Sequence, residues 1–176
     1  METGAPLLHG EHTRISITHT MGLYAVATLP PTPEADLGVF SERTALGIDA
    51  ERVDRQKVLN VRQRFLTADE LALIPEDNLE ANIIAWTCKE AVIKATLNPS
   101  IDWHNNIIIE SLPTAVSTIE QKSRVPQPSK YYGAAHAMID GRQVPFILYT
   151  YRTGEHDEFI VTIAITPRTA TYSKLK

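Results

Sequence analysis

The chain has 176 residues, 43% of them hydrophobic and 22% charged, which suits one folded domain over residues 1–176 with a substantial core. Its formal net charge of −4 argues against a nucleic-acid binder, because contacts to a phosphate backbone require a basic surface. The single cysteine, Cys88, excludes an internal disulfide and a cysteine zinc site, and since the sequence shows neither a signal-peptide pattern nor an apolar run of membrane-spanning length, we expect a cytoplasmic protein with no membrane partner.

Strand patterns come first along the chain and return in its second half. Residues 15–29 predict a strand, a turn at Met21-Gly22 and a second strand, because apolar residues alternate before the turn and dominate after it. Further strands are predicted at residues 44–51, 106–111, 115–120, 131–140, 143–152 and 159–166. Turn residues predict hairpins at Asp140-Gly141 and at residues 153–157.

Three helices are predicted in the middle of the chain, and they cover residues 53–66, 67–74 and 76–97. The second begins with Thr67 as its N-cap, and Glu70 three residues on completes a capping box. The third is the longest and is closed by Asn98-Pro99. This order predicts the α+β class, in which a mostly antiparallel sheet is packed by one long helix and one or two shorter ones.

The segment WTCKEAVIKA, residues 86–95, places charged residues in the longest predicted helix. At about 100° per residue, apolar side chains occupy two roughly opposite faces of this helix. The strip that carries Glu90 and Lys94 is therefore expected to be at least partly enclosed, where unpaired charges are costly. The ordinary alternative is a surface ion pair, since an acid four residues before a lysine is a favourable arrangement on a helix.

The segment GIDAE, residues 47–51, carries two acids on one side of a predicted strand. Because side chains alternate along a strand, Asp49 and Glu51 point to one side while Ile48 and Ala50 point to the other. Two neighbouring carboxylates repel unless a cation or a shared proton relieves them. Oxygen ligands of this kind suit magnesium. The alternative is an edge strand that shows its polar face to water.

The segment SITHT, residues 16–20, ends a predicted strand with His19 between the hydroxyls of Thr18 and Thr20. A histidine and hydroxyls at a strand end can bind phosphate oxygens. The alternative is a structural histidine with its hydrogen bonds satisfied, which is the more frequent role of a lone histidine.

Together these three segments, in this order and at this spacing, resemble the 4'-phosphopantetheinyl transferase superfamily. That family has a Ser-His-like strand end, a Gly-Ile-Asp-x-Glu strand and a Trp-x-x-Lys-Glu-x-x-x-Lys helix. RFLTADEL at residues 64–71 also looks like the family's Arg-Phe-Phe-x-x-x-Glu stretch, and GAPLL at residues 4–8 looks like its Gly-Lys-Pro loop. The resemblance runs from about Gly4 to Ala95.

The resemblance implies an enzyme that transfers the 4'-phosphopantetheine group of coenzyme A to a serine of an apo acyl or peptidyl carrier protein. It implies that Asp49, Glu51 and Glu90 hold Mg2+ on the coenzyme A pyrophosphate. Glu90 would also be the base for the incoming serine, and Lys94 would contact the pyrophosphate and stabilise the leaving phosphate.

The resemblance also implies residues that hold coenzyme A and its partner. His19, with Thr18 nearby, would bind a coenzyme A phosphate, and Lys89 would support cofactor binding. Because carrier proteins of this system are acidic, the basic residues after the Asp-x-Glu strand are candidates for a docking face, with a solvated helix face as the alternative. They are Arg52, Arg55, Lys57, Arg62 and Arg64.

The sequence departs from the family at its start. Ala5 stands in place of the loop lysine, and the chain resembles a second lobe without the first lobe of two-lobe members. Three explanations remain open: a homo-oligomer supplies the missing surface, the sequence is a shortened form of a longer protein, or the protein is a non-catalytic homologue that binds coenzyme A or a carrier protein. A magnesium-dependent phosphatase or nuclease would share the carboxylates but leaves the helix motif unexplained.

Overall fold

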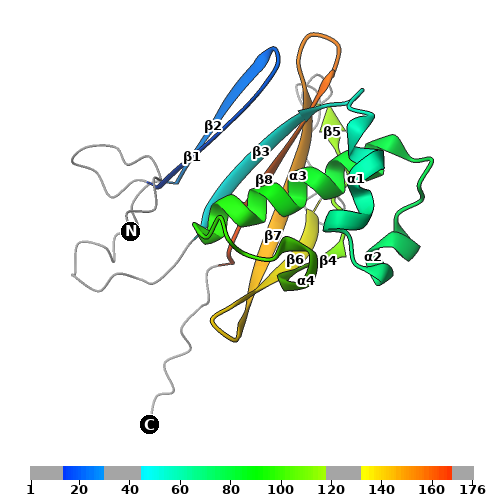
Figure 1. Ribbon diagram of the computed structural model, residues 1–176. Coiled ribbons are helices and arrows are strands. Elements are labelled where there is room, and N and C mark those ends of the chain that lie inside the picture. The colour runs from blue at the N-terminus through cyan, green and yellow to red at the C-terminus, as the bar shows by residue number, and fades with distance from the viewer. Residues whose placement is uncertain (1–13, 30–44, 118–131, 168–176) are drawn as a thin grey trace.

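The computed structural model describes residues 14–29, 45–117 and 132–167, and its main element is an antiparallel sheet (Figure 1). The strands lie in the order β3 (Leu46–Arg52), β8 (Phe159–Ile165), β7 (Arg142–Thr153), β6 (Tyr132–Ile139) and β4 (Ile107–Ser111). A short strand, β5 (Val116–Ser117), pairs in parallel with β7. The predicted strand at 115–120 is thus described only in part. The remaining strands, β1 (Arg14–Thr20) and β2 (Leu23–Leu29), form a separate hairpin.

Helix α3 (Leu79–Thr96) lies across one face of the sheet and packs mainly on β3 and β8 (Figure 1). The shorter helices are α1 (Lys57–Phe65), α2 (Ala68–Leu73) and α4 (Trp103–Asn106). The predicted α+β class is therefore confirmed. Helix α4 was not expected; it is a single turn capped by the side chain of Asp102, which accepts hydrogen bonds from the backbone N–H groups of His104 and Asn105.

The ends of the helices follow from local sequence. Thr67 Oγ1 accepts from the backbone N–H of Glu70, and Glu70 Oε2 accepts from that of Thr67, which confirms the predicted capping box. Helix α3 begins at the N-cap Asn78 and ends at Leu97, which adopts a left-handed conformation immediately before Asn98-Pro99. The predicted end of the longest helix is thus confirmed.

The main core lies between α3 and the sheet. On α3, Cys88, Ala91 and Val92 have no exposed surface, so the helix is enclosed as its sequence predicted. Beside the core, the rings of Phe65, Trp86 and Trp103 pack against one another, with centroids 5.1–5.9 Å apart. None of the helices in the described ranges is both long and apolar enough to cross a membrane.

Gly47 allows β3 to approach α3 closely. A Cβ atom at this position would lie 1.9 Å from the backbone oxygen of Ala91 and 2.7 Å from the backbone nitrogen of Ala95. The absence of a side chain therefore sets the short separation between the strand that carries Asp49 and the helix that carries Lys94.

The predicted β6–β7 turn is confirmed, and it is formed by two residues with positive φ, Asp140 at 49° and Gly141 at 72°. The loop at residues 4–8 that looks like the family's Gly-Lys-Pro loop lies outside the described residues, and with it the expectation attached to Ala5.

Candidate active site

Strand β3, at the edge of the sheet, carries two buried carboxylates. Asp49 and Glu51 are each 7% exposed. They point to the α3 side, whereas Ile48 and Ala50 point into a second apolar cluster shared with the β1–β2 hairpin. The alternative of an edge strand that shows its polar face to water is therefore wrong.

Lys94 and Thr18 both bind the same oxygen of Asp49. Lys94 Nζ donates to Asp49 Oδ1 at 2.8 Å, Thr18 Oγ1 lies 3.1 Å from that oxygen, and Lys94 Nζ lies 3.1 Å from Thr18 Oγ1. Asp49 Oδ2 is buried and has no hydrogen-bond partner in the described part of the chain. One carboxylate oxygen thus accepts two side-chain hydrogen bonds, while the other is enclosed and accepts none from the described residues.

Glu51 is held by a similar combination of one cation and one hydroxyl. Arg55 Nη1 donates to Glu51 Oε2 at 2.5 Å, and Thr20 Oγ1 donates to the same oxygen at 3.5 Å. Arg55 lies four residues after Glu51, just beyond the end of β3, and its side chain is 41% exposed. This contact was not predicted, although opposite charges four residues apart are a sequence signal for it.

Glu90 lies on α3 one turn before Lys94 and is half-buried. Lys94 forms its ion pair with Asp49, which lies 45 positions away in the chain. The lysine therefore joins the helix to the strand, which is a different arrangement from the surface pair with Glu90 that its spacing also allowed.

Burial raises the pKa values of all three carboxyl groups. For Asp49, desolvation is the largest cause and outweighs Lys94, which lowers the pKa. For Glu51, desolvation outweighs the hydrogen bond and charge of Arg55. For Glu90, desolvation comes first and repulsion from Asp49 adds to it. Raised carboxyl pKa values mean that the surroundings disfavour the negative charge of these groups.

The three carboxylates offer oxygen donors of the kind that a hard divalent cation prefers. Across residues 14–29, 45–117 and 132–167, however, no three His, Cys, Asp or Glu side chains gather closely enough to hold a metal ion. Lys94 and Arg55 lie at the oxygens of Asp49 and Glu51 instead. Asp49 Oδ2 is enclosed and accepts no side-chain hydrogen bond within the described residues.

Strand β1 places Thr18 and His19 on opposite sides of the hairpin. Thr18 is 3% exposed, and its hydroxyl contacts Asp49 and Lys94; the expectation that it binds a coenzyme A phosphate stays a prediction. His19 is exposed, and its ring stacks on that of Tyr24 with centroids 5.8 Å apart. The structure therefore brings Thr18 to the carboxylates and leaves His19 on the outer side.

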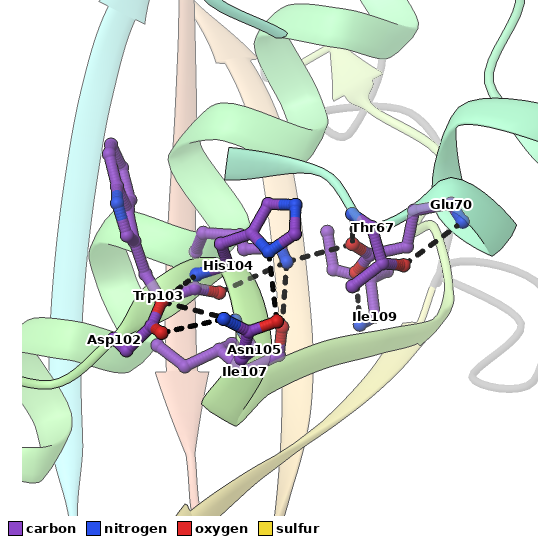
Figure 2. A network of polar contacts seen from close by, with 9 residues as sticks. Thr67, Glu70, Asp102, Trp103, His104, Asn105, Ile107 and Ile109 are labelled. Carbon is purple, nitrogen blue, oxygen red and sulfur yellow. Dashed lines mark hydrogen bonds and ion pairs between the residues drawn. The ribbon is translucent and has the colours of Figure 1, made fainter. Parts of the chain in front are cut away.

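Lys89 is separated from the other candidate residues. Its side chain has no exposed surface, and its ammonium donates to Glu70 Oε2 at 2.8 Å and to the backbone oxygens of Trp103 and Ile107 at 3.2 and 2.6 Å. Figure 2 shows these acceptors, together with the bond from the backbone N–H of Ile109 to Glu70. All three donors of Lys89 are used, which supports a structural role, and the expected role in cofactor binding stays a prediction.

Arg62, a member of the basic cluster, is also buried. Its guanidinium donates to Asn82 Oδ1 at 2.9 Å and to the backbone oxygen of Ile74. It therefore cannot contribute to a docking face. Lys57 and Arg64 are exposed on α1.

Comparison with known proteins identifies the family of the chain. A family profile described as the 4'-phosphopantetheinyl transferase superfamily matches residues 45–147, which is more than half of the chain and includes Asp49, Glu51, Glu90 and Lys94. No curated protein matches the sequence in a direct comparison. On the extent of the profile match, the chain belongs to the 4'-phosphopantetheinyl transferase superfamily.

Proposed function

We propose that this protein transfers the 4'-phosphopantetheine group of coenzyme A to a serine hydroxyl of an apo acyl or peptidyl carrier protein, in a Mg2+-dependent reaction. The observation that carries the proposal is the buried Asp49, whose free Oδ2 lies in a cluster with Glu51, Glu90 and Lys94. A family member that only binds a partner has little need of such a costly buried charge cluster.

By donor type the described acids suit Mg2+, but in this geometry no three of them gather closely enough to hold the ion, so they would have to move together to bind it. The donors are carboxylate oxygens, one of them is buried without a partner, and the pKa values of all three acids are raised by desolvation, the largest cause in each case. Asp49, Glu51 and Glu90 would hold the ion. When bound, the ion neutralises charge on the pyrophosphate oxygens of coenzyme A.

Glu90 is the residue proposed to receive the proton of the carrier-protein serine, directly or through a water. The serine oxygen then forms a bond to the phosphorus that carries the pantetheine arm, and the bond from that phosphorus to the bridging pyrophosphate oxygen breaks. Lys94 would stabilise the charge left on adenosine 3',5'-bisphosphate. Burial raises the pKa of Glu90, which strengthens it as a base, whereas the charge of Lys94 opposes the shift.

His19 is proposed to bind a phosphate of coenzyme A that lies away from the pyrophosphate. Its side chain is exposed on the side of β1 opposite to Thr18, which contacts Asp49. Coenzyme A has such a second phosphate on its ribose. Lys57 and Arg64 remain proposed contacts for an acidic carrier protein because both are exposed on α1.

The proposal is tested by incubating the protein with coenzyme A, Mg2+ and an apo carrier protein and measuring the intact mass of the carrier protein. We expect a mass gain equal to one phosphopantetheine group. Glu90→Gln and Asp49→Ala should each abolish the gain, while Glu155→Gln, at an exposed acid between β7 and β8, should leave it unchanged.

Two results would redirect the proposal. No mass gain while coenzyme A still binds would replace it with a non-catalytic binding homologue. Full transfer by the double variant of Glu90 and Asp49 would contradict the assignment of the site. Light scattering on the same sample measures whether the active species is a homo-oligomer.

A further inference from the structure

Three threonine hydroxyls form a chain of hydrogen bonds in the core between the sheet and α3. Thr150 Oγ1 of β7 lies 2.9 Å from Thr162 Oγ1 of β8, and Thr162 Oγ1 lies 2.7 Å from Thr87 Oγ1 of α3. All three residues are buried, with exposed fractions of 0–2%. A set of buried hydroxyls can be replaced by apolar groups of the same shape at little cost in stability, so core packing alone does not require this threonine chain.

The direction of the threonine chain follows from its end on α3. Thr87 Oγ1 donates its single hydrogen to the backbone oxygen of Ile84 at 3.0 Å. It can therefore only accept from Thr162, and Thr162 in turn accepts from Thr150. The chain thus runs from β7 through β8 to the helix, and every hydroxyl hydrogen in it is bonded.

Thr87 lies on the side of α3 that carries Glu90 and Lys94. Spacings of three and seven residues place the three side chains within about 60° of one another around the helix axis, with Glu90 between the other two along it. Thr87 bonds to Thr162 of the sheet. Lys94 bonds to Asp49, the direct cross-strand partner of Thr162 in the β3–β8 register. Two polar contacts on either side of Glu90 therefore reach neighbouring points of the sheet.

The threonine contact fixes the helix more closely than the longer polar side chains of α3 do. A hydroxyl on the β-carbon has one stiff rotatable bond, whereas a long charged side chain can follow a helix that slides or rotates. Glu80 and Arg152 form such a long, partly exposed pair at the start of α3. Lys89 lies two residues from Thr87, on nearly the opposite side of the helix. Because apolar contacts are non-directional, the Thr162–Thr87 bond is the short, buried contact that sets the register of this side of α3.

We propose that Thr162 is a positioning residue for the transfer reaction: by donating to Thr87 it sets the register of α3 on the sheet, and with it the position of Glu90. This inference rests on the proposed function, in which Glu90 receives the proton of the carrier-protein serine. It requires no contact of Thr162 with a substrate. A shift of α3 along or around its axis would move the base relative to the reacting atoms, and the rate of a transfer step is sensitive to such a shift.

The first test compares two double variants that differ in the hydroxyl at position 162. Thr150→Val with Thr162→Val removes both donors of the chain and leaves no hydroxyl hydrogen unpaired, whereas Thr150→Val with Thr162→Ser restores the hydroxyl that reaches Thr87. We expect kcat for transfer to the carrier protein to fall about 10- to 100-fold in the double valine variant. The KM for coenzyme A and the urea midpoint should not change, because valine keeps the shape of threonine. The serine variant should return kcat to the wild-type value. Thr87→Val breaks the same bond from the helix side and is the second variant if the first does not fold.

The second test measures coupling to Lys94 and needs no activity. Lys94→Met leaves the buried Asp49 without its ammonium partner and should lower the urea midpoint of the wild type. In the double valine variant the loss should be smaller, because α3 no longer holds Lys94 in place. Equal losses in the two backgrounds would mean that the sites are independent and would overturn the inference. Thr28→Val, at an exposed threonine of β2, is the control background, in which Lys94→Met should have its wild-type effect.

The outcomes separate this inference from the proposed function. Unchanged kcat in both the double valine variant and Thr87→Val, while the wild type transfers the group, would overturn the positioning role of Thr162 alone. A fall in kcat that serine at position 162 does not restore would assign the effect to packing and would overturn that role as well. A wild type that transfers no group to the carrier protein would overturn the proposed function, and the role of Thr162 in the reaction with it.

Discussion

Replacing Lys89 by methionine tests whether this motif lysine is structural. The change removes the ammonium from a site with no exposed surface and leaves the carboxylate of Glu70, which is 2% exposed, without its ion-pair partner. The backbone oxygens of Trp103 and Ile107 lose a donor at the same time. Methionine has a similar length, so the expected effect comes from the lost charge rather than from a cavity.

The expected loss in the free energy of unfolding is about 3 kcal/mol, at the low end of the range of ~3–5 kcal/mol for removing one partner of a buried ion pair. The low end applies because Glu70 keeps two backbone donors, Thr67 at 2.7 Å and Ile109 at 2.7 Å. A domain of this size loses roughly 2–4 °C of melting temperature per kcal/mol, so Tm should fall by about 6–12 °C.

The assay is urea unfolding followed by tryptophan fluorescence, since Trp86 and Trp103 pack against each other beside α3. Lys57→Met is the matched control, at an exposed lysine, and should change stability by less than about 0.5 kcal/mol. The double variant Glu70→Gln with Lys89→Met should cost less than the sum of its two single changes, because neither charge is left alone.

If Lys89→Met lowers the free energy of unfolding by less than about 1 kcal/mol, this reasoning is refuted, because removing a buried ammonium with all its hydrogen bonds should cost more. A raised KM for coenzyme A with unchanged stability would restore the role in cofactor binding that the motif implied.

Three further predictions concern residues around the same helix. Burial raises the pKa of Cys88 to about 12, so the native protein should not react with a thiol reagent at pH 8 and should react fully in urea; rapid native labelling would contradict the packing. Because burial raises the pKa of Glu90, its folded state binds the proton more tightly than its unfolded state, and its charge opposes folding above that pKa. Glu90→Gln should therefore raise the Tm of metal-free protein at pH 7, with a smaller gain at pH 4, and a lowered Tm would show that another group compensates the charge. Gly47→Ala should cost about 3 kcal/mol in urea unfolding, since its methyl would meet the backbone of α3; a neutral effect would mean that β3 and α3 lie farther apart.

Local sequence determined much of the framework. The capping box at Thr67 and Glu70, the turn at Asp140-Gly141 and the end of α3 before Asn98-Pro99 each depend on residues within a few positions of one another, and all three are confirmed. Helix α4 escaped prediction because one turn capped by Asp102 has no apolar period to reveal it.

The alternation of side chains along a strand also predicts the direction of His19. Alternation along β1 places His19 on the side opposite Thr18 and Thr20, so the three could not act together at one ligand. The opposite directions of Asp49 and Ile48 on β3 were predicted by the same rule, and the structure confirms them.

The partner of each charge was decided only by the tertiary structure. Lys89 and Lys94 are five residues apart, or about 140° around the helix, so one can enter the core while the other reaches the sheet. Because apolar residues lie on both sides of α3, the sequence did not show which lysine enters the core and which one contacts the sheet. Arg62 donates to Asn82, 20 positions away, because α1 packs on α3. Lys94 donates to Asp49, 45 positions away, because α3 packs on β3.

The sequence by itself determined most of the elements, the family motifs and the chemical types in the site, because these depend on short-range periodicity and composition. Only the tertiary structure decided that Asp49 has one saturated and one free oxygen, that Thr18 is a partner of that carboxylate, and that Lys89 is a buried counter-ion of Glu70. The physical reason is that hydrogen bonds and ion pairs between distant segments depend on which faces pack together, and the spacing of residues along one segment does not encode that.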